Sequence, residues 1–228
     1  SRDLRADFVS VFAECSRDPD IRVLVLTGVG KAFCAGFDLK ELGNTQEDSA
    51  AEEADNAVAR AMEAFDGPII GAINGHCITG GFEMALACDV LIASENARFA
   101  DTHARVGILP GWGLSQRLPR LVGLSRAKEI SFTGTPVYAQ QAYEWGLVNH
   151  VVSADELLPR ATAMAAEMCA CVPDILRRYK QQVDHGYNMP LDEALAWEEE
   201  RAIESAREAP GAMVEARRRD VLEKGRSE

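Results

Sequence analysis

The chain has 228 residues, of which 47% are hydrophobic and 26% are charged, and its formal net charge is −12. A chain of this length and composition can bury a sizeable core as one large domain or two small ones. The negative charge argues against a broad surface for nucleic acid or anionic membrane. An anionic small ligand would therefore need a local cluster of Lys or Arg.

The apolar runs are too short to span a bilayer, and no secretory signal precedes the first predicted helix. Six cysteines are scattered along the chain without a paired framework. Cys169 and Cys171 are two residues apart, so they point to different faces of a helix. We therefore expect a cytoplasmic protein with reduced thiols rather than one with disulfides or a zinc site.

The N-terminal part begins with apolar residues at helical spacing, which predict an amphipathic helix over residues 3–16. Residues 23–26 form a continuous apolar run, typical of a strand that is covered on both faces. Residues 44–57 are polar and acidic without an apolar period, which indicates a mobile loop or an exposed helix start. A second helix follows over residues 58–65 and ends at Gly67-Pro68.

Residues 69–73 and 89–93 predict two further buried strands with a helix between them, so this region is predicted to be a βαβ unit. The helix follows a glycine-rich turn and carries Glu83 in its first turn. N–H groups at a helix start can bind an anion, and the pair Gly80-Gly81 lets a ligand approach the main chain. Donors beside a carboxylate suit a reaction that builds negative charge on a carbonyl oxygen. A tight turn with a solvated glutamate would give the same spacing.

The C-terminal part contains a second candidate site, Asp101-Thr102-His103-Ala104-Arg105, within a turn-rich segment that predicts irregular structure over residues 94–120. The predicted elements beyond it are helices over 125–131 and 139–145, a strand over 147–152, and a largely helical remainder over 154–224. The chain therefore divides into an α/β core, residues 1–152, and a helical region, residues 153–228.

Several motifs stand in order along nearly the whole chain. They are 31–39 (KAFCAGFDL), 73–89 (INGHCITGGFEMALACD), 107–111 (GILPG), 116–118 (QRL), the helix stop at 133–134, and 142–148. Together they resemble the enoyl-CoA hydratase/isomerase (crotonase) superfamily. The resemblance implies a crotonase-like α/β core of repeated ββα units, and a helical C-terminal region that packs homotrimers, usually paired into hexamers. It also implies an N-terminal strand and a CoA-contact segment before the first helix; because the sequence opens at Ser1, either the chain is incomplete or that part is missing.

The resemblance also assigns site residues. In the family two backbone N–H groups hold the thioester carbonyl of an acyl-CoA, and these fall on Phe37 and Gly80. The first catalytic carboxylate falls on Glu83. The second falls on His103, where hydratases typically have another glutamate. Imidazole titrates near neutrality and can hold a water or deliver a proton, although a structural histidine in a site with different chemistry is an open alternative.

Other residues of the motifs concern the substrate. The candidate substrate and CoA contacts are Lys31, Ala35, Asp38, Lys40 and Trp112. The two lysines suit a CoA phosphate or ribose, and a solvated lysine is the alternative. The aromatic residues Phe37, Phe82 and Trp112 either narrow the acyl pocket or fill the core.

The resemblance implies an acyl-CoA enzyme that stabilises a thioester enolate. We expect it to hydrate a 2-enoyl-CoA to a 3-hydroxyacyl-CoA in fatty-acid metabolism. The alternatives are an enoyl-CoA isomerase, an acyl-CoA hydrolase or lyase of the same fold, and a non-catalytic acyl-CoA binder. No metal or redox cofactor is expected, since CoA arrives as part of the substrate, and no nucleic-acid or membrane partner is expected.

Overall fold

The computed structural model of the chain describes residues 1–37, 56–209, 211, 214–215, 217–218 and 222. The candidate substrate contacts Asp38 and Lys40 lie outside the described residues. The chain forms two compact units, Ser1–Arg177 and Arg178–Glu228.

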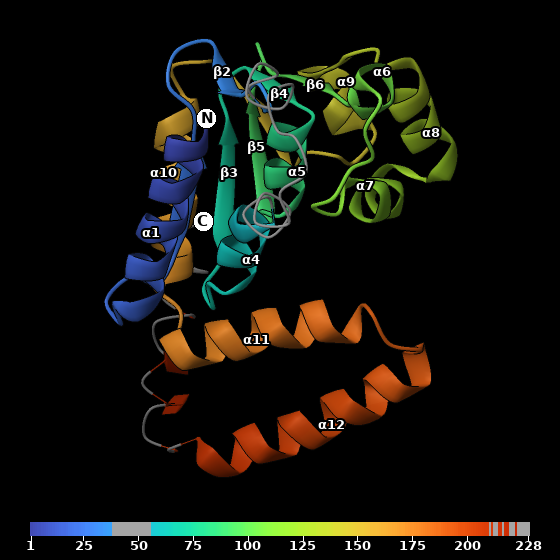
Figure 1. Cartoon of the computed structure of the whole chain (residues 1–228). Helices are drawn as coiled ribbons and strands as arrows, with labels where there is room; N and C mark the ends of the chain where they lie inside the picture. The colour runs from blue at the N-terminus through green and yellow to red at the C-terminus, as the bar shows by residue number, and fades with distance from the viewer. Residues whose placement is uncertain (38–55, 210, 212–213, 216, 219–221, 223–228) are drawn as a thin grey trace. The chain divides into compact units, whose positions relative to one another are not determined.

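The strands of the first unit form two four-stranded sheets (Figure 1). One sheet consists, in spatial order, of the parallel strands β1 (Leu24–Thr27), β3 (Ile69–Ile73), β5 (Val90–Ser94) and β8 (His150–Val152). The other consists of β2 (Ala32–Cys34), β4 (His76–Ile78), β6 (Arg98–Ala100) and β7 (Val137–Tyr138), with β7 antiparallel to β6. From β1 to β6 successive strands alternate between the sheets, so each ββ pair adds one strand to both. The expected repeated ββα architecture is confirmed, and the predicted βαβ unit contains the additional strand β4.

The helices of the described residues have the following bounds: α1 (Arg2–Arg17), α4 (Ala57–Glu63), α5 (Gly80–Leu86), α6 (His103–Val106), α7 (Leu114–Val122), α8 (Leu124–Thr133), α9 (Ala139–Glu144), α10 (Leu157–Cys169), α11 (Pro173–Gly186) and α12 (Leu191–Glu208). The predicted N-terminal helix and the helices near 125–131 and 139–145 are confirmed. The segment 94–120, predicted as irregular, instead contains β6, α6 and α7.

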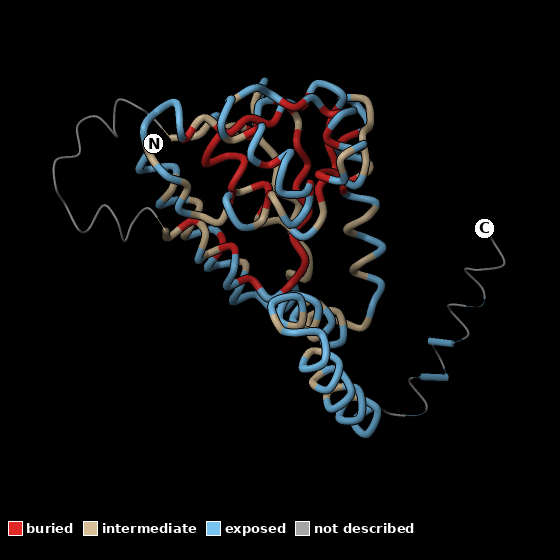
Figure 2. Tube along the Cα trace, turned by 90° about the vertical axis from the view of Figure 1, so that its right-hand side faces the viewer, coloured by how far each residue is buried: buried red, intermediate tan, exposed pale blue. Residues whose placement is uncertain are grey.

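The core lies on both faces of the central strands, which explains why β3 is a continuous apolar run. Alternate residues of a strand face opposite sides of the sheet. Ile70 and Ala72 pack with Leu157 and Ala161 of α10, whereas Ile73 belongs to the cluster beneath α5 and α7. Buried residues accordingly concentrate in the part of the chain that carries the sheets (Figure 2). The helix α10 thus packs on the α/β core although it lies within residues 153–228.

The second unit contains α12 and most of α11, which lie side by side (Figure 1). Arg178 Nη1 contacts Glu208 Oε2 at 2.6 Å, and the rings of His185 and Trp197 are 5.4 Å apart. Neither helix has a buried residue in the described part of the chain, and apolar side chains such as Leu195 are exposed. Because the described part of this helical pair buries no residue, the pair has no core of its own. Its exposed ion pairs contribute little to stability.

Candidate active site

Three of the predicted site residues follow the carboxyl ends of three neighbouring parallel strands. In the second sheet β2 leads to Phe37, β4 leads to Gly80, and β6 leads to His103. Adjacent strands lie about 4.8 Å apart, so groups at the same end of three strands come together. The carboxyl edge of parallel strands is also a common place for ligands to bind.

Close packing between β2 and α5 accounts for the second glycine of the Gly80-Gly81 pair. A Cβ built on Gly81 would lie 2.2 Å from the carbonyl oxygen of Cys34, so no larger residue fits unless the backbone moves. A Cβ built on Gly80 would instead lie 3.3 Å from Cε2 of Phe37. The helix α5 therefore begins directly against the segment that carries Phe37.

The two predicted carbonyl-binding N–H groups belong to segments that run side by side. A Cβ built on Gly36 would lie 3.1 Å from the carbonyl oxygen of Ile78 and 3.8 Å from the nitrogen of Gly80. Gly80 is the first residue of α5, where a backbone N–H has no partner within the helix. Among the described residues no hydrogen bond uses the N–H of Phe37 or of Gly80.

Glu83 is held inside the first unit by α5, and its side chain is 1% exposed. Its Oε1 accepts hydrogen bonds from the backbone N–H of Trp112 at 2.7 Å and from that of Leu114 at 3.4 Å. Its Oε2 lies 3.5 Å from Nε2 of His103. One carboxylate oxygen is thus fixed by the main chain, and the other faces the imidazole.

His103 is the first residue of α6 and is also buried. Its Nδ1 lies 2.7 Å from Oδ1 of Asp101, and the same oxygen accepts the backbone N–H of His103 at 3.0 Å. Asp101 itself is 2% exposed. The ring is therefore held from behind by Asp101, so that Nε2 is directed at Glu83.

The two flanking carboxylates keep His103 charged. Burial alone would lower the pKa of the imidazole, but the hydrogen bonds and charges of Asp101 and Glu83 outweigh burial and raise the pKa from 6.5 to about 9. For Asp101, burial raises the pKa of the carboxyl group, and hydrogen bonds from His103 and Ser131 reverse the effect and lower the pKa. At neutral pH His103 is an imidazolium with a proton on each ring nitrogen.

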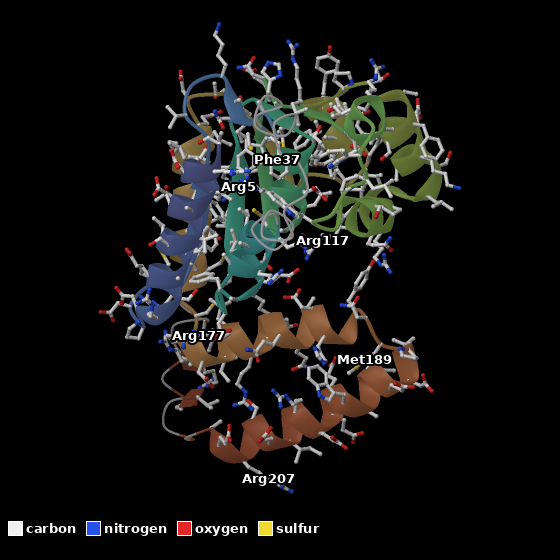
Figure 3. All side chains as sticks on the ribbon, viewed as in Figure 1. Arg5, Phe37, Arg117, Arg177, Met189 and Arg207 are labelled. Atoms are coloured by element: carbon white, nitrogen blue, oxygen red, sulfur yellow. The ribbon has the colours of Figure 1, made fainter. Side chains whose placement is uncertain are left out.

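Two aromatic rings lie beside Gly80. The ring centroids of Phe37 and Trp112 are 5.1 Å apart, and both rings approach Gly80. The guanidinium of Arg5 lies 4.9 Å from the centroid of the Phe37 ring (Figure 3). Phe82 is different, since it is fully buried against Phe99 in the core. Two of the three predicted aromatics therefore lie next to Gly80, and the third lies in the core.

The two other predicted contacts that the structure describes flank β2. Lys31 is exposed in the turn before β2 and forms no ion pair with a described residue, and Ala35 is exposed just after β2. Within residues 1–37 and 56–209 and the isolated positions beyond, no cluster of His, Cys, Asp and Glu could hold a metal ion. None of the helices in that same part of the chain is long and apolar enough to cross a membrane.

Sequence reasoning did not assign a role to Asp101. The signal was present, because Asp101 precedes His103 by two residues, a spacing at which a carboxylate can bond both the backbone and the ring of the histidine. The backbone N–H groups of Trp112 and Leu114 also belong to the site, but main-chain donors leave no signature in the side-chain sequence.

Comparison with known proteins identifies relatives that share the sequence and the fold. The family model of enoyl-CoA hydratase/isomerase matches residues 1–217. A probable peroxisomal enoyl-CoA hydratase 1 of Arabidopsis thaliana is 41% identical over 89% of this chain and 76% of its own length. A short-chain-enoyl-CoA hydratase of Clostridium acetobutylicum is 38% identical over 91% and 83%. The crystal structure of an enoyl-CoA hydratase from Bacillus anthracis superposes with a TM-score of 0.88 at 35% identity, covering 96% of this chain and 87% of that one.

Proposed function

This chain belongs to the enoyl-CoA hydratase/isomerase family, and from that premise we propose that it adds water across the double bond of a 2-enoyl-CoA to give a 3-hydroxyacyl-CoA. The observation that carries the proposal is the buried pair of Glu83 and His103, with side-chain atoms 3.5 Å apart and with Glu83 one helical turn after Gly80 in α5. Hydration needs a base for water, an acid for the α-carbon and a donor pair for the thioester oxygen.

The N–H groups of Phe37 and Gly80 would bind the thioester oxygen. When water attacks the β-carbon, electrons move onto this oxygen and an enolate forms. Donors fixed in advance stabilise that charge without reorganising, and removal of one such donor typically costs about 3–4 kcal/mol. The assignment of these two donors is supported by the close approach of the segment that carries Phe37 to the start of α5 at Gly80.

Glu83 would act as the base. Its Oε2 takes a proton from the attacking water as the oxygen bonds to the β-carbon, while Oε1 stays anchored to the N–H of Trp112. A carboxylate held at one oxygen keeps the other in place for proton transfer.

His103 would act as the acid in place of the second glutamate of other hydratases. Its imidazolium gives the Nε2 proton to the α-carbon of the enolate, which completes the addition of water. Glu83 is then protonated and His103 is neutral. The direct contact of Oε2 with Nε2 lets the proton return to the imidazole, and this restores both groups for the next turnover.

The substrate brings CoA with it, so the proposed reaction needs no further cofactor. We also propose a cytoplasmic location, because none of the six cysteines, all of which lie among the described residues, forms a disulfide, which suits a reducing compartment. A homotrimer or hexamer is proposed as the assembly, since the exposed apolar side chains of α11 and α12, such as Val183 and Leu195, suit burial against another copy.

The test is a hydration assay with short- and medium-chain trans-2-enoyl-CoA thioesters. Loss of the enoyl chromophore should accompany a product heavier by one water. Glu83→Gln keeps an acceptor for the N–H of Trp112 but lacks the base, and we expect a fall in kcat of about 10²–10⁴-fold. Exposed Glu156→Gln is the matched control and should retain activity.

Other outcomes of the assay would contradict hydration and identify a different activity. A rearranged double bond without added water identifies an isomerase, and free CoA thiol identifies a hydrolase. Tight acyl-CoA binding without turnover identifies a binder. Hydration by the wild type that is no faster than by Glu83→Gln would refute the role of Glu83.

A further inference from the structure

Thr79, which directly precedes the proposed oxyanion donor Gly80, has an unusual backbone conformation. Its φ of 54° and ψ of −109° make it the only residue other than glycine with positive φ in the described part of the chain. β-branched residues rarely adopt positive φ, because the side chain crowds the backbone. Such conformations persist where the surroundings hold them, and they cluster at functional sites.

The hydroxyl group of Thr79 is bonded to the turn that carries His103. Oγ1 of Thr79 lies 2.5 Å from Oγ1 of Thr102 and also accepts the backbone N–H of Thr102 at 3.2 Å. The backbone N–H of Thr79 donates to the carbonyl oxygen of Ala100 at 2.8 Å. These bonds therefore extend the pairing of β4 and β6 beyond the ends of both strands, as far as Thr102, the residue before His103.

The other side of Thr79 meets the segment that carries Phe37. A Cβ built on Gly36 would lie 3.6 Å from Cβ of Thr79 and 3.8 Å from the nitrogen of Gly80. Thr79 is 7% exposed. It therefore stands between all three strand ends, which supply both proposed carbonyl donors and the proposed acid.

We propose that Thr79 and Thr102 form a latch, the hydroxyl pair just described, that sets the N–H of Gly80 in register with the imidazolium of His103. Thr79 is thus a positioning residue, and it does not touch the substrate. Glycine would adopt this φ without steric cost, whereas threonine adds a hydroxyl that reaches Thr102. The latch rests on the proposed function, since it aligns the groups of that reaction.

The variants Thr79→Ala and Thr102→Val remove one hydroxyl each, and Thr79→Ser keeps the hydroxyl of Thr79. We expect kcat for enoyl-CoA hydration to fall about 10–100-fold in the first two, with KM within about 3-fold, because small displacements of aligned groups act mainly on the chemical step. Thr79→Ser should stay within about 3-fold of the wild type. Thr27→Val is the matched control, since it removes a threonine hydroxyl bonded to the carbonyl of Ala72 in the other sheet.

The double variant Thr79→Ala/Thr102→Val separates a latch from two independent structural effects. If the two hydroxyls act as one unit, the losses of kcat from the two substitutions should not multiply. The kcat of the double variant should then be no more than about 2-fold below that of the less active single variant. Multiplied losses, or losses in kcat that follow the loss of thermal stability across all variants, would overturn the proposal.

A second readout does not depend on hydration. Saturated butyryl-CoA labelled with ¹³C at the thioester carbonyl cannot be hydrated, but its carbon resonance moves downfield when two N–H groups polarise the carbonyl. We expect a downfield shift on the wild type and on Thr79→Ser, and a smaller shift on Thr79→Ala and Thr102→Val.

If the wild type shifts the resonance but does not hydrate enoyl-CoA, and Thr79→Ala reduces the shift, the latch stands and the proposed hydration fails. If hydration occurs while Thr79→Ala leaves both kcat and the carbon resonance unchanged, the latch fails alone. A wild type that does not shift the resonance refutes the latch, because there is then no aligned donor pair for it to hold.

Discussion

Replacing Asp101 with asparagine tests the electrostatic argument for His103 most directly. Asparagine keeps an oxygen that can accept from Nδ1 and from the backbone N–H of His103, but it removes a negative charge 2.7 Å from the ring. The position is 2% exposed, so water screens this charge weakly. The variant therefore changes the charge next to His103 while preserving its geometry.

The expected magnitude follows from the pKa of the imidazole. In the wild type that pKa is about 9. Burial lowers it, and the hydrogen bonds and charges of Asp101 and Glu83 together raise it. Loss of an adjacent opposite charge typically shifts a pKa by about 1–3 units, and a drop of about 2 would place the pKa of His103 near 7. At about pH 7.5 the imidazolium fraction would fall from about 97% to about a quarter, so kcat/KM should fall about 4-fold from protonation alone.

The assay is the pH dependence of kcat/KM for enoyl-CoA hydration. We expect the alkaline limb of the wild type to break near pH 9 and that of Asp101→Asn to break about 2 units lower. At about pH 6 both enzymes carry the imidazolium, and their rates should approach each other. Asp89→Asn removes a carboxylate that binds the N–H of Ile69 instead, and it should leave the profile unchanged.

A wild-type profile without an alkaline limb would show that the His103 proton is not used. An Asp101→Asn profile that breaks where the wild type does would show that Asp101 does not set the charge of the ring. Either result refutes the reasoning. Titration of the His103 ring by NMR, with His103→Gln to assign the signal, checks the pKa without relying on turnover.

Three further predictions concern stability and specificity. Because folding raises the pKa of His103, its contribution to the free energy of unfolding is complete below about pH 6.5 and is lost as pH rises through about 9. Urea unfolding should show a decline on the order of 3 kcal/mol across that window, and His103→Gln should remove most of the decline. Gly81→Ala should lower the free energy of unfolding by about 1–3 kcal/mol, measured in the same way, because the new methyl meets the backbone of Cys34; Gly186→Ala, which meets only an ordinary contact, should not. Phe37→Ala removes a ring beside Gly80 and Trp112 and should raise the ratio of kcat/KM for medium-chain over short-chain enoyl-CoA about 10-fold; the exposed Phe132→Ala should leave the ratio unchanged, and an unchanged ratio in Phe37→Ala would place the acyl chain elsewhere.

Long buried strands were predictable from the sequence, whereas the second sheet was not. β3 is an apolar run of five residues, which its burial on both faces explains. The strands β2, β4 and β6 have three residues each, too few to establish a period of two. Their pairing depends on neighbours supplied by successive turns of the chain, so only the family resemblance indicated them.

The candidate site was predictable in its residues but not in its contacts. Phe82 and Glu83 are adjacent in sequence, and successive helical residues point about 100° apart. One therefore enters the core and the other the site, which aromatic content alone did not reveal. The conformation of Thr79 was likewise hidden, because it is imposed by Thr102 and Gly36 from two other strand ends rather than by its own sequence neighbours.

The delivery of one functional group by each of three parallel strand ends has an evolutionary consequence. Phe37 follows β2, Gly80 follows β4 and His103 follows β6, so each group has its own segment of chain. Descendants of one ancestor can then exchange Asp101 and His103 while keeping Thr102, which is bonded to Thr79 beside the proposed carbonyl donor Gly80. Under the proposed mechanism, diversity of reaction can accumulate at one strand end while the two proposed carbonyl donors are inherited from the other two.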